Sequence, residues 1–152
     1  MIIRVKIMKK LYYDPKKCTA CKTCEIVCAI GHSPSKDLYT AIVEDNVSLP
    51  SVRVYVGQEG NFPLACRHCK DHPCVNACIA SALSYDTEKG LLFNKEKCVG
   101  CWMFVMACPY GAVRTDKRDN KSVRCDLCAD INDPRCAKNC PTKAIVYVEE
   151  KK

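Results

Sequence analysis

The sequence predicts an α+β fold in which two small units are fused and short strands and helices surround bound metal. Three observations lead to this prediction. The chain has 15 cysteines among 152 residues, these cysteines fall into four groups of similar spacing, and the segments between the groups alternate apolar and polar residues as short strands do. A chain of this length suits one domain or two small fused units. With one Trp and three Phe, apolar packing alone is not expected to hold it together.

All fifteen cysteines belong to the four groups. The first group follows the pattern CxxCxxCxxxC, the second is two residues longer before its third cysteine, and the fourth has a longer loop at the same point. The third group has Phe104 where the pattern calls for its third cysteine. The groups are Cys18, Cys21, Cys24 and Cys28; Cys66, Cys69, Cys74 and Cys78; Cys98, Cys101 and Cys108; and Cys125, Cys128, Cys136 and Cys140.

This spacing is typical of iron-sulfur clusters. Three cysteines on a tight loop can bind three corners of an iron-sulfur cube, while the fourth, expected at the start of a short helix, points toward a neighbouring cluster. Pro109 and Pro141 directly follow the last cysteines of the third and fourth groups, where a proline suits a turn or first helical turn because no amide donor is needed. Each group is therefore predicted to serve two clusters.

Two other uses of cysteine fit less well. Disulfides would leave one cysteine of an odd number unpaired, and residues 1–10 are too short and too charged for a signal peptide. Zinc sites would leave orphan thiolates, and the third cysteine of CxxCxxC has no role in a zinc ribbon. His68 and His72 do not follow a Rieske spacing, so we expect surface or hydrogen-bonding roles and no metal. A zinc-binding structural or nucleic-acid-binding module is the alternative of another class.

The formal net charge of +7 would ordinarily suggest an acidic partner such as nucleic acid. This figure omits the clusters, because four clusters of about −2 each, counted with their sulfurs, would bring the total to about −1. We therefore interpret the basic residues as charge compensation and expect no nucleic-acid partner. No apolar run approaches the roughly 18 residues of a membrane span, so we expect a soluble, cytoplasmic protein with reduced cysteines.

Two hairpins are predicted between the groups. Residues 82–94 (ALSYDTEKGLLFN) alternate around a turn at residues 88–90. Residues 112–124 (AVRTDKRDNKSVR) form a similar pattern with Asp119 and Asn120 at the tip.

The ends of the chain and the long connection complete the expected elements. Residues 144–150 (AIVYVEE) predict a closing strand, with which residues 1–14 are expected to pair. Residues 51–58 (SVRVYVGQ) alternate like a half-buried strand inside the connection 29–65. This connection is the least informative segment, and both a cover over the clusters and a surface for a partner fit it.

The distances between the groups predict how they pair. The second and third groups are close in sequence and form a natural two-cluster unit, which leaves the first and fourth to form the other. We therefore expect a unit A of about residues 1–30 plus 112–152, a unit B of about residues 60–111, and an insertion at 31–59.

These segments also carry a family resemblance. The four groups in this order resemble the four-cluster ferredoxin-type electron-transfer subunits of anaerobic redox complexes, a family with members in molybdopterin oxidoreductases and hydrogenases. The segments DPKKCTACKTCEIVC, PLACRHCKDHPCVNAC and CVGCWMFVMACPYGA are most similar to the CooF-type carriers of anaerobic carbon monoxide dehydrogenase. The resemblance covers almost the whole chain and implies two fused bacterial-ferredoxin-like units without a membrane segment.

The resemblance also implies the ligand sets. Three sets are complete and would each hold a [4Fe-4S] cluster: Cys18, Cys21, Cys24 and Cys140; Cys125, Cys128, Cys136 and Cys28; and Cys66, Cys69, Cys74 and Cys108. The fourth site keeps only Cys98, Cys101 and Cys78, because Phe104 stands where the family has a cysteine.

Phe104 leaves three outcomes for the fourth site. The site could hold a [3Fe-4S] cluster, a cube whose last iron binds water or another ligand, or no cluster, with Phe104 filling the core. The residues from Trp102 to Met106 are all apolar, which favours a packed side chain over a solvent ligand. A [3Fe-4S] cluster or an empty site is therefore expected.

The sequence contains no recognisable catalytic motif. Neither a nucleotide-binding glycine loop nor a nucleophile–base pair can be identified. We expect a non-catalytic, oxygen-sensitive carrier that accepts single electrons from a catalytic redox enzyme and passes them to another oxidoreductase. Carbon monoxide dehydrogenase is the favoured donor, and a hydrogenase, formate dehydrogenase or other molybdopterin enzyme is the alternative.

Overall fold

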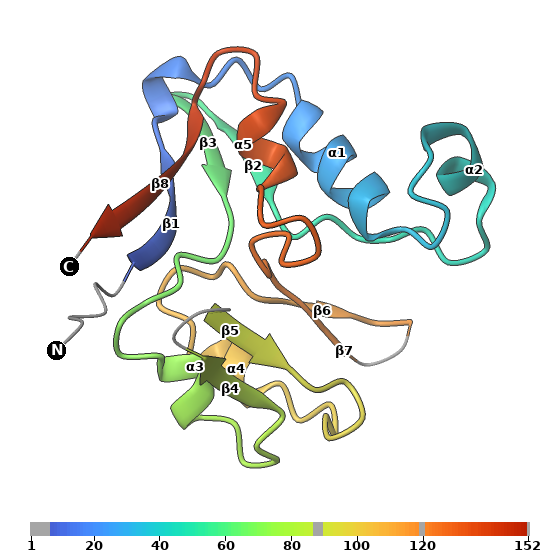
Figure 1. The fold of residues 1–152 in the computed structure, drawn as a ribbon, viewed down its shortest axis with the longest axis vertical. Helices are drawn as coiled ribbons and strands as arrows, with labels where there is room; N and C mark the ends of the chain where they lie inside the picture. Colours follow the sequence, from blue (N-terminus) through green and yellow to red (C-terminus); the bar gives the residue numbers. More distant parts are fainter. Residues whose placement is uncertain (1–6, 87–89, 119–120, 152) are drawn as a thin grey trace, which may run out of the picture.

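The computed structural model describes residues 7–86, 90–118 and 121–151, and Figure 1 shows their path. Within them, four two-stranded antiparallel sheets are joined by short helices, as expected for the predicted α+β class. The paired strands are β1 (Ile7–Tyr13) with β8 (Ile145–Lys151), β2 (Arg53–Gly57) with β3 (Gly60–Leu64), β4 (Leu83–Asp86) with β5 (Gly90–Phe93), and β6 (Arg114–Asp116) with β7 (Lys121–Val123). The helices are η1 (Pro15–Lys17), α1 (Thr23–His32), α2 (Leu38–Val43), α3 (Pro73–Asn76), α4 (Met103–Met106) and α5 (Arg135–Lys138).

The terminal strands and both hairpins form where the sequence predicts them. In the β1–β8 pair, Tyr13 lies opposite Ile145, so the two ends of the described chain are joined along seven residues of each strand. In the β4–β5 hairpin, Gly90 is already the first residue of β5, and the rest of the predicted turn, residues 88–89, lies outside the described residues. The predicted tip at Asp119 and Asn120 also lies outside them.

The helices of the cysteine groups begin near the third cysteine position of each group, whereas the sequence predicts a start at the fourth. The second residue of each helix is the third position of its group: Cys24 in α1, Cys74 in α3, Phe104 in α4 and Cys136 in α5. The prediction that the fourth cysteine starts the helix is therefore wrong. In α1 the fourth cysteine lies inside the helix, and in the other groups it follows the end of a four-residue helix. In every group the helix begins at the residue before the third position, whatever the length of the loop that precedes it, and so presents the third position in its first turn.

Helix contacts pair the groups. Helix α1 packs against α5, and α3 packs against α4. Figure 1 shows α1 and α5 beside the β1–β8 ribbon in the upper part of the molecule, α3 and α4 beside β4 and β5 in the lower part, and β6–β7 between them.

The long connection has two different parts. Strand β2 forms where the alternating pattern predicts a strand, with Val54 buried and Val56 exposed, and β3 lies against β1 and η1. Helix α2 stands apart on the right of Figure 1. Its N-terminus is capped by Asp37, whose carboxylate accepts a hydrogen bond of 3.1 Å from the Thr40 amide. Tyr39 on this helix is 81% exposed.

The core contains nearly as many cysteines as large apolar residues. The least exposed large side chains include Phe104, Ile145 and Val52. Buried cysteines lie beside them in one cluster: Cys24, Cys28, Cys66, Cys78, Cys125, Cys136 and Cys140. Within the described residues, none of the helices combines the length and apolar character that crossing a membrane requires.

Candidate iron-sulfur centres

The four cysteine loops share an unusual backbone conformation. In each CxxC segment the residue before the second cysteine has a left-handed φ. These residues are Ala20 (57°), His68 (47°), Gly100 (71°) and Leu127 (58°). Left-handed residues beside right-handed ones turn successive amide N–H groups toward the same side, and such concavities surround many iron-sulfur sites. Three of the four positions are not glycine, so the loops adopt this conformation despite its cost of roughly 1–2 kcal/mol per residue.

The third group keeps this backbone although it lacks a cysteine. Lys22, His72 and Trp102 are left-handed at the same place, two residues before the third position of the first, second and third groups. Gly111, three residues after Cys108, is also left-handed, as are its counterparts Ser81 and Lys143. The loop around Phe104 therefore has the conformation of a cluster-binding loop, with a phenyl ring in place of a thiol.

Cys18, Cys21, Cys24 and Cys140 line one cavity. The cavity contains about 290 Å³ of space free of atoms, part of it open to solvent, and Val54 and Pro63 of the β2–β3 hairpin close one side. Burial raises the pKa of Cys24 to about 12, and charges on Cys21 and Cys140 contribute. The last cysteine of the fourth group is thus brought to the loop of the first, and part of the long connection covers this cavity.

Cys66, Cys69, Cys74 and Cys108 line a second cavity. It contains about 400 Å³ of space free of atoms, part of it open to solvent. His68 also lines it and is only 7% exposed, and neither of its ring nitrogens has a hydrogen-bond partner among the described residues. Burial lowers the pKa of His68 to about 4, so the ring is neutral at pH 7.

The two histidines of the second group behave differently from each other. The surface role expected for His68 is wrong, because this residue is buried. The hydrogen-bonding role stays a prediction. His72 stacks on Tyr85 with 3.7 Å between the ring centroids.

Cys28, Cys125, Cys128 and Cys136 form a third group, which interacts electrostatically with Cys24 of the first cavity and Cys66 of the second. Burial raises the pKa of Cys136 to about 12, with contributions from the charges of Cys28 and Cys128, and Cys125 interacts with both Cys136 and Cys28. Burial also disfavours the Cys28 thiolate, but hydrogen bonds from His32 and from the Ser51 amide, 3.3 Å from Sγ, lower its pKa.

The fourth site is different. Cys78 is buried and its Sγ accepts a hydrogen bond of 3.2 Å from the Ala82 amide, whereas Cys101 is exposed. Phe104 is 1% exposed and meets Phe93 edge-on, with 6.4 Å between ring centroids. The phenyl ring is therefore part of the core, as expected from its apolar context.

The donors fit iron-sulfur clusters better than single ions. Two cavities are each lined by four cysteines, the donors that such clusters use. Within the described part of the chain, no three His, Cys, Asp or Glu side chains form a group suited to one metal ion, and sulfurs around a cube must lie farther apart than sulfurs around one zinc. The raised pKa values keep the Cys24, Cys66 and Cys136 thiols protonated at pH 7 without metal, so binding releases protons.

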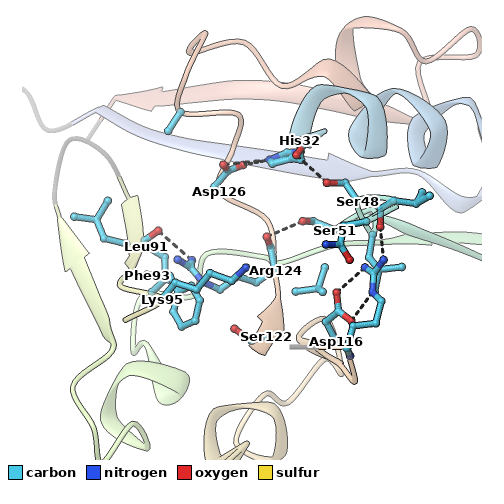
Figure 2. A pocket seen from close by; sticks show the side chains of 17 residues that line it. His32, Ser48, Ser51, Leu91, Phe93, Lys95, Asp116, Ser122, Arg124 and Asp126 are labelled. Atoms are coloured by element: carbon cyan, nitrogen blue, oxygen red, sulfur yellow. Dashed lines mark hydrogen bonds and ion pairs between the residues drawn. The ribbon is translucent and has the colours of Figure 1, made fainter. Parts of the chain in front are cut away.

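The structure also brings together residues that sequence reasoning missed. An open groove of about 690 Å³ lies beside the cysteine sites, and Figure 2 shows its lining. In it, His32 Nε2 lies 3.1 Å from an Asp126 carboxylate oxygen, and Arg124 lies over the Phe93 ring at 5.2 Å. The one available sequence signal was that Arg124 and Asp126 flank Cys125.

Comparisons with known proteins agree with this geometry. Residues 59–150 match the 4Fe-4S dicluster domain family. The chain is 35% identical over 158 aligned residues to the electron transport protein HydN of Escherichia coli K12, covering 91% of this chain and 87% of HydN. It is 37% identical over 128 residues to the polyferredoxin-like subunit of the aliphatic sulfonate oxidoreductase of Pyrococcus furiosus, covering 83% of this chain and 68% of that subunit.

A solved structure shares the fold. The BamBC active-site complex of benzoyl coenzyme A reductase, as isolated, contains a chain that superposes with a TM-score of 0.57 at 21% identity, covering 98% of this chain and 81% of that one. Its likeness bears on the fold alone. Together with the cysteine-lined cavities, these matches show that the chain belongs to the 4Fe-4S dicluster, ferredoxin-type family of iron-sulfur electron-transfer proteins.

Proposed function

We propose that this protein is a single-electron relay with three [4Fe-4S] clusters and a fourth, three-cysteine site. The observation that carries the proposal is the presence of four cysteines around each of two cavities, with a third set of four between them. The proposed ligands are Cys18, Cys21, Cys24 and Cys140; Cys28, Cys125, Cys128 and Cys136; and Cys66, Cys69, Cys74 and Cys108. When bound, such clusters supply one-electron redox chemistry.

The sites are proposed to follow one another in a line. Cys24 of the first set contributes to the electrostatic environment of Cys136 in the next. Cys66 likewise contributes to that of Cys125. Cys78, expected to serve the fourth site, follows the helix that carries Cys74. The set containing Cys28 and the set containing Cys66 would thus be interior, with the Cys18 set at one end and the Phe104 site at the other.

The protein's own residues have definable roles in such a relay. Val54 and Pro63 close one side of the Cys18 cavity, and the left-handed loop residues turn backbone N–H groups inward. Hydrogen bonds to cysteine sulfur, such as that from the Ser51 amide to Cys28, stabilise negative charge and so favour the reduced state.

At the fourth site, Cys78, Cys98 and Cys101 are the proposed ligands. The burial of Phe104 supports a [3Fe-4S] cluster or an empty site over a cube with a solvent ligand. We also propose the two-unit division, with unit A at about 1–30 and 112–152 and unit B at about 60–111. The contacts of α1 with α5 and of α3 with α4 support it. The contact of β3 with β1 and η1 ties the end of the insertion to unit A.

The first test is the metal content of anaerobically reconstituted protein. We expect brown protein with about 15 irons per chain and a [3Fe-4S] EPR signal when oxidised, or about 12 irons and no such signal if the fourth site is empty. Colourless protein that binds zinc would overturn the proposal and favour the zinc-module alternative.

The partner is proposed on resemblance. Similarity to CooF-type carriers points to carbon monoxide dehydrogenase as the donor in an oxygen-sensitive, cytoplasmic relay to a further oxidoreductase. The match to a subunit of an aliphatic sulfonate oxidoreductase supports a role of such carriers with enzymes other than carbon monoxide dehydrogenase. The second candidate class comprises hydrogenase, formate dehydrogenase and molybdopterin oxidoreductases.

Reduction by candidate enzymes separates the two classes. With CO and a trace of carbon monoxide dehydrogenase, the visible absorbance of the loaded protein is expected to bleach. If the protein stays oxidised with CO but bleaches with H₂ and hydrogenase, or with formate and formate dehydrogenase, the donor belongs to the second class.

A further inference from the structure

Arg124 lies at the junction of the two interior cysteine sets. It follows β7 and directly precedes Cys125, one of the proposed ligands of the Cys28 set. Its Nη1 donates a hydrogen bond of 3.1 Å to the Leu91 carbonyl oxygen. Leu91 lines the cavity of Cys66, Cys69, Cys74 and Cys108. The Arg124 backbone is thus joined to one site, and its guanidinium group is fixed to the wall of the other.

The guanidinium group is held in place from several sides. It lies 5.2 Å from the centre of the Phe93 ring. The backbone of Arg124 is fixed as well, because its carbonyl oxygen accepts a hydrogen bond of 2.7 Å from Ser51 Oγ. Figure 2 shows the side chain running toward Leu91 and Phe93. The Nε atom is fully buried and has no hydrogen-bond partner among the described residues. The charge therefore has a defined position at the wall of the groove, on a side chain that is half-buried.

The charge of Arg124 acts on both sites. Cys66 and Cys74 on one side, and Cys125 on the other, all interact electrostatically with it. Asp126 is the carboxylate among its electrostatic partners, and this carboxylate already accepts hydrogen bonds from His32 and from the Cys128 amide. A guanidinium group stays protonated at any pH at which the protein is folded, so the positive charge is permanent.

We propose that Arg124 is a positioning residue that raises the reduction potentials of the two interior clusters together. This inference rests on the proposed function. When an interior cluster accepts an electron from its neighbour, no bond forms or breaks, and the added negative charge is stabilised by the fixed cation without uptake of a proton. Because coulombic interactions are stronger in a partly buried site than in bulk water, one cation near both sites raises both potentials and keeps the middle of the relay reducible.

The test is an EPR-monitored redox titration of the full, anaerobically loaded chain. Arg124→Gln removes the charge and keeps an amide that can donate to Leu91. In this variant the ratio of reduced to oxidised cluster at a fixed potential should fall about tenfold for two clusters, a shift of about 59 mV each for one-electron couples. The other clusters should keep their midpoints. Arg124→Lys, which retains the charge, should restore most of the shift.

Arg118→Gln is the matched control. Arg118 lines the same groove and follows the neighbouring strand β6, but it is exposed and paired with Asp116. Its removal changes net charge equally and should leave all midpoints in place, because exposed charges are screened.

The outcomes separate the two proposals. Absence of iron-sulfur signals in the wild-type chain would overturn the proposed function itself. Normal iron content with unchanged midpoints in Arg124→Gln, or equal shifts of every cluster in both Gln variants, would overturn the role of Arg124 alone. If Arg124→Gln fails to load iron, Arg124→Met, which keeps the side-chain length and fills the same space, is titrated against Arg124→Lys. The expected order of the interior potentials is then wild type, Lys and, lowest, Met.

Discussion

Phe104 is the residue at which this chain departs from its own repeat. It occupies the second position of α4, where α1, α3 and α5 carry a cysteine, and it follows the same left-handed backbone as Cys24 and Cys74. Yet it is 1% exposed and packs on Phe93. The substitution has changed the side chain without changing the loop, so the loop should still accept a sulfur ligand.

Phe104→Cys is therefore expected to complete the fourth site. Iron content should rise to about 16 per chain, and any [3Fe-4S] signal of the oxidised protein should disappear as a [4Fe-4S] cluster forms. In the metal-free chain the smaller side chain leaves a cavity, at a cost of about 2–4 kcal/mol in unfolding free energy. Metal analysis and EPR check the first expectation, and denaturant unfolding of the metal-free protein checks the second.

Phe104→Leu is the control for this experiment, since it also makes the side chain smaller but brings no sulfur ligand. Its iron content should equal that of the wild type. An unchanged iron content in Phe104→Cys, with the three complete sites loaded, would mean that position 104 cannot reach a cluster.

The sequence could predict which cysteines line the two cavities, because three of the four cysteines around each cavity come from one loop. The ligand sets themselves stay a prediction. Arg124 could not be found in this way. Its proposed role depends on Leu91 and Phe93, about thirty residues earlier in the chain, and no spacing rule connects Arg124 to them.

At the scale of elements, the packing of α1 on α5 holds the first and fourth groups together. Gly31 of α1 lies directly against Arg135 of α5, and a Cβ atom at position 31 would lie 2.6 Å from Arg135 Nε and 2.9 Å from Cζ. Arg135 is itself fixed by two hydrogen bonds to Asp130, of 3.1 and 2.8 Å. The glycine therefore leaves room for the Arg135 side chain where the two helices pack.

Gly31→Ala is expected to displace Arg135 and weaken its pair with Asp130. We expect a loss of about 1–3 kcal/mol in stability, typical of added volume at a packed contact, measured by anaerobic unfolding of the loaded protein. In an Arg135→Ala background the same substitution should cost much less. Equal costs in the two backgrounds would show that the Gly31–Arg135 contact does not limit the packing.

The starts of the cysteine helices could not be predicted from the sequence, whereas the strands could. The alternating segments predict the strands correctly, because burial on one face leaves a period of two in the sequence. The cysteine helices are only four residues long except for α1, too short to show any helical period. A left-handed residue directly precedes α1, α3 and α4, and these residues, Lys22, His72 and Trp102, are not of a type that predicts such a conformation.

At the scale of the whole molecule, the order of the sites is the feature that matters for function. Cys24 interacts electrostatically with Cys136, and Cys66 with Cys125, which supports the proposal that the Cys28 set is an internal link. The sequence motifs alone imply shared loops but give no order along a path. In the proposed arrangement that order depends on tertiary contacts between segments far apart in the sequence.

A linear order predicts that the loss of one internal site divides the relay. In Cys136→Ala, iron should fall by about 4 per chain, and a donor enzyme should reduce only the clusters on its own side of the gap, leaving the rest oxidised in rapid-freeze EPR at low protein concentration. Cys98→Ala removes a ligand at one end, so the remaining three sites stay contiguous and should be reduced together or not at all. Uniform reduction of all remaining clusters in Cys136→Ala would contradict the linear order. Partial reduction would support the linear order and also identify the end at which the donor binds. A donor at the Cys18 end would reduce only the Cys18 cluster, and a donor at the other end would reduce the Cys66 cluster.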